Sequence, residues 1–175
     1  MSAAWDEMAE RGYAKFTLEA VASRAGTSRP VLYRRWPGRA DLAKAAMKHH
    51  LSRHPISVPD LGSVREDLVA LLRQFSAKRA PIATTFMLNL SGYFAETKSS
   101  YADLRNEFAS RGPIDDILQR GIERGEIDPR KLTPRIASLP FDLARHEMMM
   151  TMAPVPDSVI AEILDEIFLP LVMPD

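Results

Sequence analysis

Apolar residues recur along most of this chain at intervals of three and four, the spacing that places side chains on one face of an α-helix. Strict alternation of apolar and polar residues, which is typical of half-buried strands, is nearly absent. The pattern therefore predicts an all-α protein. Four short helices are expected in its N-terminal part, at residues 3–11, at 18–25, between Ser28 and Pro37, and at 39–53.

Residues that start and stop helices support these boundaries. Gly12 is expected to end the first helix, and the hydroxyl groups of Thr17 and Ser28 suit the N-caps of the second and third. Pro30 falls in the first turn of the third helix, where its missing N–H costs nothing. Gly26 provides a tight turn between the second and third helices.

A second group of helices is predicted after an extended segment at residues 54–59, where prolines disfavour helix. They are expected at residues 64–78, 81–96, 101–124 with an interruption near Gly112, 134–152 and 159–171. A chain of 175 residues can bury a sizeable core. We therefore expect an N-terminal domain at residues 1–53 and a larger C-terminal helical domain at residues 60–175.

The formal net charge of zero conceals an asymmetry between these two parts. Residues 1–53 carry ten Lys/Arg against five Asp/Glu, whereas the rest of the chain carries thirteen against eighteen. Residues 24–39 hold five arginines and no acid. This distribution predicts that only the N-terminal domain contacts a polyanion.

Two short helices joined by a glycine turn form a helix-turn-helix, whose second helix fits the major groove of DNA. Arg29 lies at the start of that helix and can donate two hydrogen bonds to guanine O6 and N7. Thr17 and Ser28 would cap helices in any protein. Arg24, Arg34 and Arg35 have the alternative of being solvated charges, and this is the interpretation we favour for Arg24. The predicted DNA-contacting residues are Thr17, Thr27, Ser28, Arg29, Pro30, Val31, Tyr33, Arg34 and Arg39.

The order of residues in this region resembles the DNA-binding domain of the TetR family of bacterial transcription regulators. The matching residues are Gly12-Tyr13, Thr17, Val21-Ala22, Arg24-Ala25-Gly26, Thr27-Ser28, Leu32-Tyr33-Arg34 and Trp36-Pro37. The resemblance implies a homodimer that binds a palindromic operator on double-stranded DNA. It also implies repression that a small-molecule effector relieves, and a four-helix dimer interface built from the last two helices of each subunit.

The last two predicted helices carry more apolar surface than one edge helix needs. Their apolar side chains either form the dimer interface or complete the core of one subunit, and the sequence alone does not divide them. The predicted interface residues are Leu143, Met150, Ile160, Ile163, Leu164, Ile167 and Phe168.

The middle of the C-terminal domain is rich in Phe, Met and Tyr, which would suit a pocket for an apolar or aromatic ligand. The alternative for each residue is ordinary core packing at helical spacing. The predicted pocket residues are Phe75, Phe86, Met87, Leu90, Tyr93, Phe108, Phe141, Arg145 and Met149.

Three classes of function are compatible with an all-α chain of this kind: a ligand-responsive repressor, an architectural DNA-binding protein without an effector, and a helical enzyme. No nucleophile motif or phosphate-binding glycine loop supports an enzyme, so we expect neither catalytic residues nor a cofactor. The chain has no cysteine, and no acid completes a metal site beside His49, His50 and His54. No apolar run approaches the ~20 residues of a membrane span, and we expect a cytoplasmic protein with no membrane partner.

Overall fold

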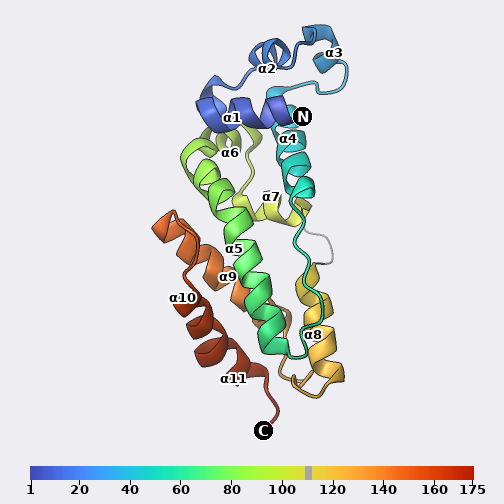
Figure 1. Cartoon of the computed structure of the whole chain (residues 1–175). Coiled ribbons are helices and arrows are strands. Elements are labelled where there is room, and N and C mark those ends of the chain that lie inside the picture. The colour runs from blue at the N-terminus through green and yellow to red at the C-terminus, as the bar shows by residue number, and fades with distance from the viewer. Residues whose placement is uncertain (109–111) are drawn as a thin grey trace. The chain divides into compact units, whose positions relative to one another are not determined.

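The computed structural model describes residues 1–108 and 112–175, including their side chains except at 81–89, 105, 106 and 108. In these ranges all regular secondary structure is helical, as the sequence pattern predicts (Figure 1). The chain forms two compact units. The head unit comprises Met1–Pro55 and Thr85–Ala109, and the body unit comprises Ile56–Thr84 and Ser110–Asp175. The head unit thus contains the predicted N-terminal domain together with a segment from the predicted C-terminal one.

The helices of the head unit begin and end close to the predicted positions in its N-terminal part. The first, α1, is longer than predicted, but Gly12 departs from helical geometry within it, with φ 72° and ψ 165°. The glycine therefore turns the chain where the sequence predicts a helix end. The elements are α1 (Ser2–Lys15), α2 (Leu18–Arg24), α3 (Arg29–Tyr33), α4 (Arg39–Arg53), α6 (Ser91–Thr97) and α7 (Tyr101–Phe108).

A single apolar core holds the head unit together, and α1 packs across α4 within it (Figure 1). Phe16 is fully buried, and Leu32 anchors the short α3 in this core with 7% of its surface exposed. Trp36 is only half-buried at its edge. Ala25 is exposed just beyond the end of α2, so this helix is one residue shorter than the predicted range 18–25.

The body unit contains most of α5 and all helices that follow Gly112. They are α5 (Val64–Asn89), α8 (Pro113–Glu123), α9 (Pro134–Thr151), α10 (Asp157–Ala161), the π-helical segment η1 (Glu162–Phe168) and α11 (Leu169–Val172). The last three form one continuous helical run, as the sequence predicts for residues 159–171. Pro170 is the second residue of α11, directly after η1 in the same helical run, and its missing N–H removes one helical hydrogen bond there.

One predicted helix boundary is wrong. The sequence predicts separate helices at residues 64–78 and 81–96, yet α5 continues through Pro81 and ends at Asn89. A proline removes one backbone hydrogen bond, while a helix of 26 residues keeps its other bonds on either side. The break falls instead at Leu90, which is buried in the head core.

The predicted interruption near Gly112 is confirmed, since α7 and α8 are separate helices with Pro113 in the first turn of α8. Gly125 follows α8 with φ 73°, a left-handed conformation that a side chain would strain. The next helix, α9, runs through the buried Pro140.

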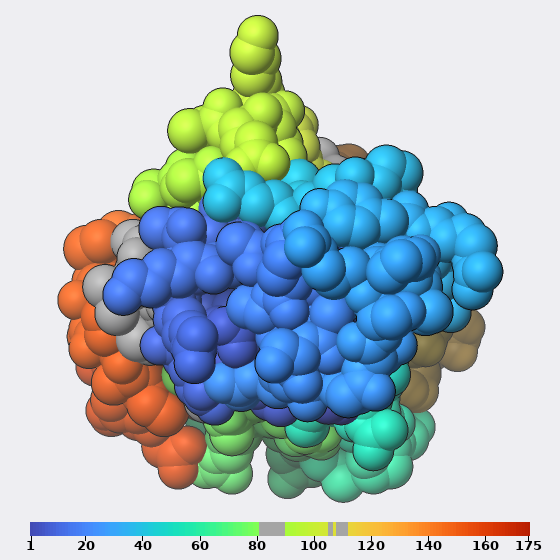
Figure 2. Space-filling view, turned by 90° about the horizontal axis from the view of Figure 1, so that it is seen from above, coloured from blue at the N-terminus to red at the C-terminus, as the bar shows by residue number. Residues whose placement is uncertain are grey.

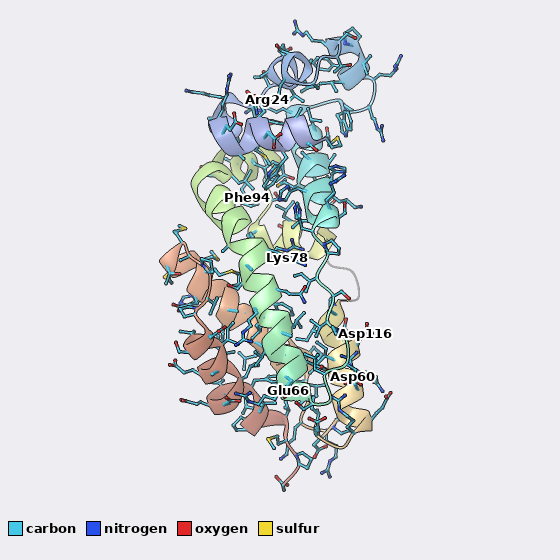
Figure 3. All side chains as sticks on the ribbon, viewed as in Figure 1. Arg24, Asp60, Glu66, Lys78, Phe94 and Asp116 are labelled. Atoms are coloured by element: carbon cyan, nitrogen blue, oxygen red, sulfur yellow. The ribbon has the colours of Figure 1, made fainter. Side chains whose placement is uncertain are left out.

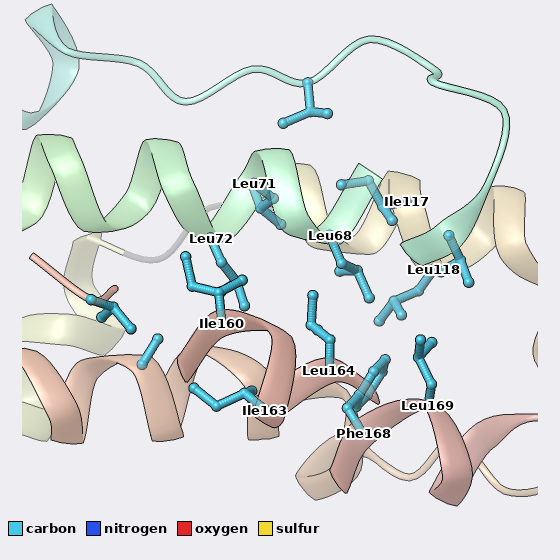
Figure 4. Close-up of a cluster of buried hydrophobic side chains, with 14 of the residues drawn as sticks. Leu68, Leu71, Leu72, Ile117, Leu118, Ile160, Ile163, Leu164, Phe168 and Leu169 are labelled. Atoms are coloured by element: carbon cyan, nitrogen blue, oxygen red, sulfur yellow. The ribbon is translucent and has the colours of Figure 1, made fainter. Parts of the chain in front are cut away.

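The core of the body unit lies between α5, α8 and the C-terminal helical run. Leu68 and Leu72 of α5 point toward Leu164 of η1, and all three side chains are fully buried (Figure 4). Ile117 and Leu118 extend this core from α8 (Figure 4). The C-terminal run therefore completes the core of one subunit.

This core corrects part of the predicted dimer interface. Four of its seven predicted residues are buried within one chain, with at most 5% of their surface exposed, and a partner could not reach them: Ile160, Ile163, Leu164 and Phe168. Leu143 is half-buried against the same core. Met150 and Ile167 remain exposed, by 65% and 40%. Apolar residues at helical spacing look alike in sequence whether they face the core or a partner.

Candidate nucleic-acid interface

The turn between α2 and α3 has the geometry of a helix-turn-helix. Gly26 adopts φ 63°, and the N–H of Thr27 donates to the carbonyl of Ala22 over 3.0 Å. Thr17 caps α2 as predicted, because its Oγ1 accepts a hydrogen bond of 3.1 Å from the N–H of Ala20. Ser28 occupies the N-cap position of α3, but its side chain makes no capping bond. The Ser28 hydroxyl is exposed and does not cap α3.

The short helix α3 presents large apolar side chains to solvent. Val31 and Tyr33 are 44% and 45% exposed, whereas Leu32 between them is buried. Arg29, Pro30 and Arg34 are exposed as well, and Figure 2 shows α1 to α3 as one continuous surface, drawn in blue. A helix that is anchored by one leucine and exposes the predicted contact residues matches the requirement for a helix that enters a groove.

Arg29 is held by an acid of the preceding helix, Glu19, which was not among the predicted site residues. Its Nη2 donates to Oε1 of Glu19 in the first turn of α2, and the hydroxyl of Tyr33 lies 3.4 Å from the same oxygen. The pKa of Glu19 lies below its usual range, because its carboxylate accepts its own backbone N–H and the Arg29 guanidinium. Glu19 thus joins two predicted DNA-contacting residues through one carboxylate.

Arg24 is exposed, but its charge is paired with acids of α1 and is not only solvated. Its Nε lies 2.9 Å from Oε2 of Glu7, which is 2% exposed, and its Nη1 donates to Oε1 of Glu10 over 2.9 Å. Figure 3 labels Arg24 beside α1. The ion pairs tie the end of α2 to α1, and hydrogen bonding to Glu10 raises the pKa of Arg24 above its usual range.

Arg39, a predicted DNA-contacting residue, begins α4 and is paired within the head unit. Its Nε and Nη2 donate to Oε2 of Glu96 on α6 over 2.8 and 2.5 Å, and its guanidinium lies 4.7 Å from the ring centre of Tyr13. The hydrogen bonds from Arg39 lower the pKa of Glu96. A phosphate would have to compete with this carboxylate for Arg39.

The predicted pocket residues fall in different units. Phe75 and Phe141 form an edge-to-face pair in the body unit with ring centres 4.7 Å apart. The guanidinium of Arg145 lies 5.9 Å from the Phe75 ring and donates to Asp142 over 2.8 Å. Met149 is half-buried on the same α9.

Two further predicted pocket residues, Leu90 and Tyr93, do not join this group. Both are buried in the head core, so for Leu90 and Tyr93 the alternative of ordinary core packing applies. The side chains of Phe86, Met87 and Phe108 lie outside the described residues.

Each unit contains a hollow, and neither is the predicted pocket. In the head unit a cavity of about 180 Å³ lies between α4, α6 and α7, and Tyr93 is the only predicted pocket residue among its described lining. In the body unit a cavity of about 420 Å³ lies beside Val64, Glu126 and Leu169. Neither cavity can be predicted from the sequence, because the lining residues come from segments far apart in the chain.

The histidines of α4 have structural neighbours. His50 stacks on Trp5 with ring centres 4.0 Å apart, and the ring of His54 lies 4.6 Å from that of His50. Within the described residues, no group of three or more potential metal ligands comes together. No helix in the same part of the chain is long and apolar enough to cross a membrane.

Comparisons with known proteins agree with this architecture. Residues 1–46 match the family model for bacterial regulatory proteins of the tetR family, and residues 58–167 match the model for a tetracyclin repressor-like C-terminal domain. A DNA-binding transcriptional repressor TetR of Mycobacteroides abscessus is 28% identical over 165 residues, covering 93% of this chain and 86% of that protein. A helix-turn-helix transcriptional regulator of Mycobacterium bovis is 29% identical over 167 residues, covering 92% and 80%.

Solved structures show the same fold. A TetR family transcription regulator superposes with a TM-score of 0.63 at 24% identity, covering 99% of this chain and 96% of that one. A flavonoid-responsive regulator superposes with a TM-score of 0.63 at 18% identity, covering 98% and 94%.

An N-terminal helix-turn-helix and an α-helical C-terminal domain define the class of helix-turn-helix transcription regulators. The chain belongs to the TetR family of bacterial regulators. Membership confirms that the protein is a DNA-binding transcription regulator and not an enzyme. Regulators of this family bind DNA operators and act as dimers.

Proposed function

We propose that this protein is a repressor that contacts base edges through the exposed face of α3 and is released from DNA by a small apolar or aromatic effector. The exposure of Val31 and Tyr33 is the observation that carries the proposal. A short helix gains nothing in water by exposing two large side chains, whereas a groove supplies contacts to both. Val31 suits a thymine methyl group, and the Tyr33 hydroxyl suits a phosphate.

Arg29 supplies the polar part of base recognition in this proposal. It begins α3, and 61% of its side chain is exposed. Ser28 and Thr27 precede it and offer hydroxyl groups to the phosphates beside the groove. Arg34 follows α3 and is exposed, so its charge reaches the same backbone.

Replacing Arg29 with alanine is expected to weaken binding to a specific site by about 1–3 kcal/mol and to have little effect on random DNA. The probes are a duplex that the wild-type protein selects from a random pool and a scrambled duplex of the same composition. Binding is measured by fluorescence anisotropy at one salt concentration.

Arg35→Ala is the matched control for this variant. Arg35 is also exposed in the head, and its guanidinium lies 5.2 Å from the centre of the Trp36 ring. The control removes the same charge and is expected to weaken both duplexes alike. If Arg29→Ala also weakens both duplexes equally, Arg29 contacts phosphate and the proposed base contact is wrong.

We further propose a homodimer whose operator is palindromic, because a twofold dimer presents two α3 helices to two equivalent half-sites. Met150 and Ile167 support an interface on the outer side of α9 and η1, two elements that pack together in the body unit. Met152 and Leu171 add exposed apolar surface on the same stretches of chain, at 40% and 45%.

For the effector we propose a site beside Phe75 and Phe141. The two half-buried rings offer aromatic faces, and Arg145 lies beside them with Asp142 as its ion-pair partner. Such a setting suits a flat, mostly apolar ligand with one polar group.

A panel of planar aromatic compounds, flavonoids included, tests the effector proposal. Compounds that bind there are expected to raise the melting temperature and to weaken operator binding by about 5–150-fold, with DNA weakening ligand binding by the same factor. Phe141→Ala should abolish both effects. Compounds that stabilise the protein and leave operator affinity unchanged would contradict allosteric release and favour the architectural alternative.

A further inference from the structure

We propose that Glu19 is a positioning residue that makes Arg29 selective for bases over phosphates. The inference rests on the proposed function, because it assigns a role to the acid that holds the proposed base-contacting arginine. Its starting observation is the ion pair between Arg29 Nη2 and Glu19 Oε1 on the exposed face of the helix-turn-helix.

The geometry of the pair leaves part of the guanidinium available. Arginine has five N–H donors in a planar fork, and Glu19 accepts from Nη2. Nε and Nη1 of Arg29 donate to no other group among the residues described. Nη2 carries two N–H bonds, and Glu19 Oε1 accepts from this nitrogen. Guanine O6 and N7 need two parallel donors, which Arg29 supplies from the second N–H of Nη2 and the parallel N–H of Nε or Nη1. A carboxylate at one edge therefore fixes the plane of the guanidinium and leaves donors for a base.

The negative charge of Glu19 disfavours an ion pair between Arg29 and a DNA phosphate. An arginine on an exposed helix can otherwise pair with any phosphate that approaches, which raises affinity for all sequences. A carboxylate within hydrogen-bond distance of that arginine repels a phosphate and competes with it for the same donors. A guanine edge offers neutral acceptors, so Glu19 does not repel it in this way.

Tyr33 strengthens the assignment, because the same carboxylate oxygen faces its hydroxyl at 3.4 Å. Glu19 comes from α2 and both of its partners come from α3, so the carboxylate bridges the two helices of the motif. The side chain of Glu19 is 41% exposed, which places the bridge at the surface and not in the core. Its role is therefore separable from folding.

The test compares selectivity, the ratio of Kd for the scrambled duplex to Kd for the selected duplex, in wild type and Glu19→Gln. The amide keeps the size of the side chain and removes its charge. Affinity for the scrambled duplex is expected to rise about threefold because a repulsive charge is lost. Selectivity is expected to fall about tenfold in total, because Arg29 loses its fixed orientation.

Glu10→Gln is the matched control. Glu10 is another exposed acid of the head that pairs with an arginine, Arg24, but it lies on α1. The same change in net charge there should leave selectivity unchanged. Glu19→Asp keeps the charge and is expected to retain most of the wild-type selectivity. Circular dichroism and thermal melting verify that each variant is folded.

The outcomes separate this inference from the proposed function. If wild type binds both duplexes equally, the proposed function itself fails. If wild type discriminates and Arg29→Ala loses that discrimination, an unchanged selectivity in Glu19→Gln overturns the role of Glu19, whichever way the two affinities move. Glu19→Gln should have no further effect on selectivity when Arg29 is already alanine. A further fall there would show that Glu19 acts without Arg29 and would also overturn the inference.

Discussion

Replacing Phe168 with alanine is expected to lower the free energy of unfolding by about 3–5 kcal/mol, because the phenyl ring is fully buried and its loss leaves a cavity in the body core. The ring packs in the cluster that includes Leu68 and Leu164 (Figure 4). Urea unfolding followed by circular dichroism measures the change. A loss below about 1 kcal/mol would show that Phe168 is not a core residue of one chain.

The neighbouring Ile167 provides the matched control. Its side chain is 40% exposed, so Ile167→Asp is expected to keep the fold and to shift the dimer toward monomer at micromolar concentration. Sedimentation velocity measures this shift. A stable Ile167→Asp dimer would contradict the proposed interface. Substitutions of these adjacent residues are thus expected to have different effects. Phe168→Ala destabilises the fold, whereas Ile167→Asp weakens dimer assembly.

The second large effect is expected at Asp67, which is fully buried near the start of α5. Its carboxylate accepts the N–H of Leu61 over 2.7 Å and Nη2 of Arg120 over 2.9 Å, and Arg124 lies 3.6 Å away. Asp67→Ala leaves two partly buried guanidinium groups without this partner. We expect a loss of roughly 3 kcal/mol in the free energy of unfolding.

Asp60 is the control for this network. It pairs with Arg124 over 2.9 Å, but 53% of its side chain is exposed. Asp60→Ala is therefore expected to cost less than about 1 kcal/mol. Equal losses in the two variants would mean that burial does not set the strength of these ion pairs. Both are measured by urea unfolding.

The elements of the head could be predicted from sequence because local signals fix them. Gly26 and Pro30 act within a few residues of their own positions, and the Thr17 cap forms a bond to Ala20 three residues away. The range predicted for the fourth helix, residues 39–53, agrees with α4. Pro81 shows the limit of local rules, because α5 continues through it from Val64 to Asn89.

The ion pairs of the head could not be predicted in this way. Arg39 and Glu96 are 57 residues apart, and Arg29 and Glu19 belong to different helices. Their pairing depends on how the helices pack and not on the spacing along one helix. For the same reason the sequence did not show which apolar residues of the last helices face the core. In the structure, Leu164 is buried in the body core and Met150 is exposed to solvent.

The most direct test of sequence-specific DNA binding is the selectivity of the wild-type protein. The measurement compares Kd for the duplex selected from a random pool with Kd for its scrambled counterpart, at one physiological salt concentration. A regulator that contacts base edges through α3 is expected to bind the selected duplex at least about 10³-fold more tightly. The selected sequence should contain two symmetric half-sites. A ratio near one, with no enriched sequence, would contradict base recognition by α3.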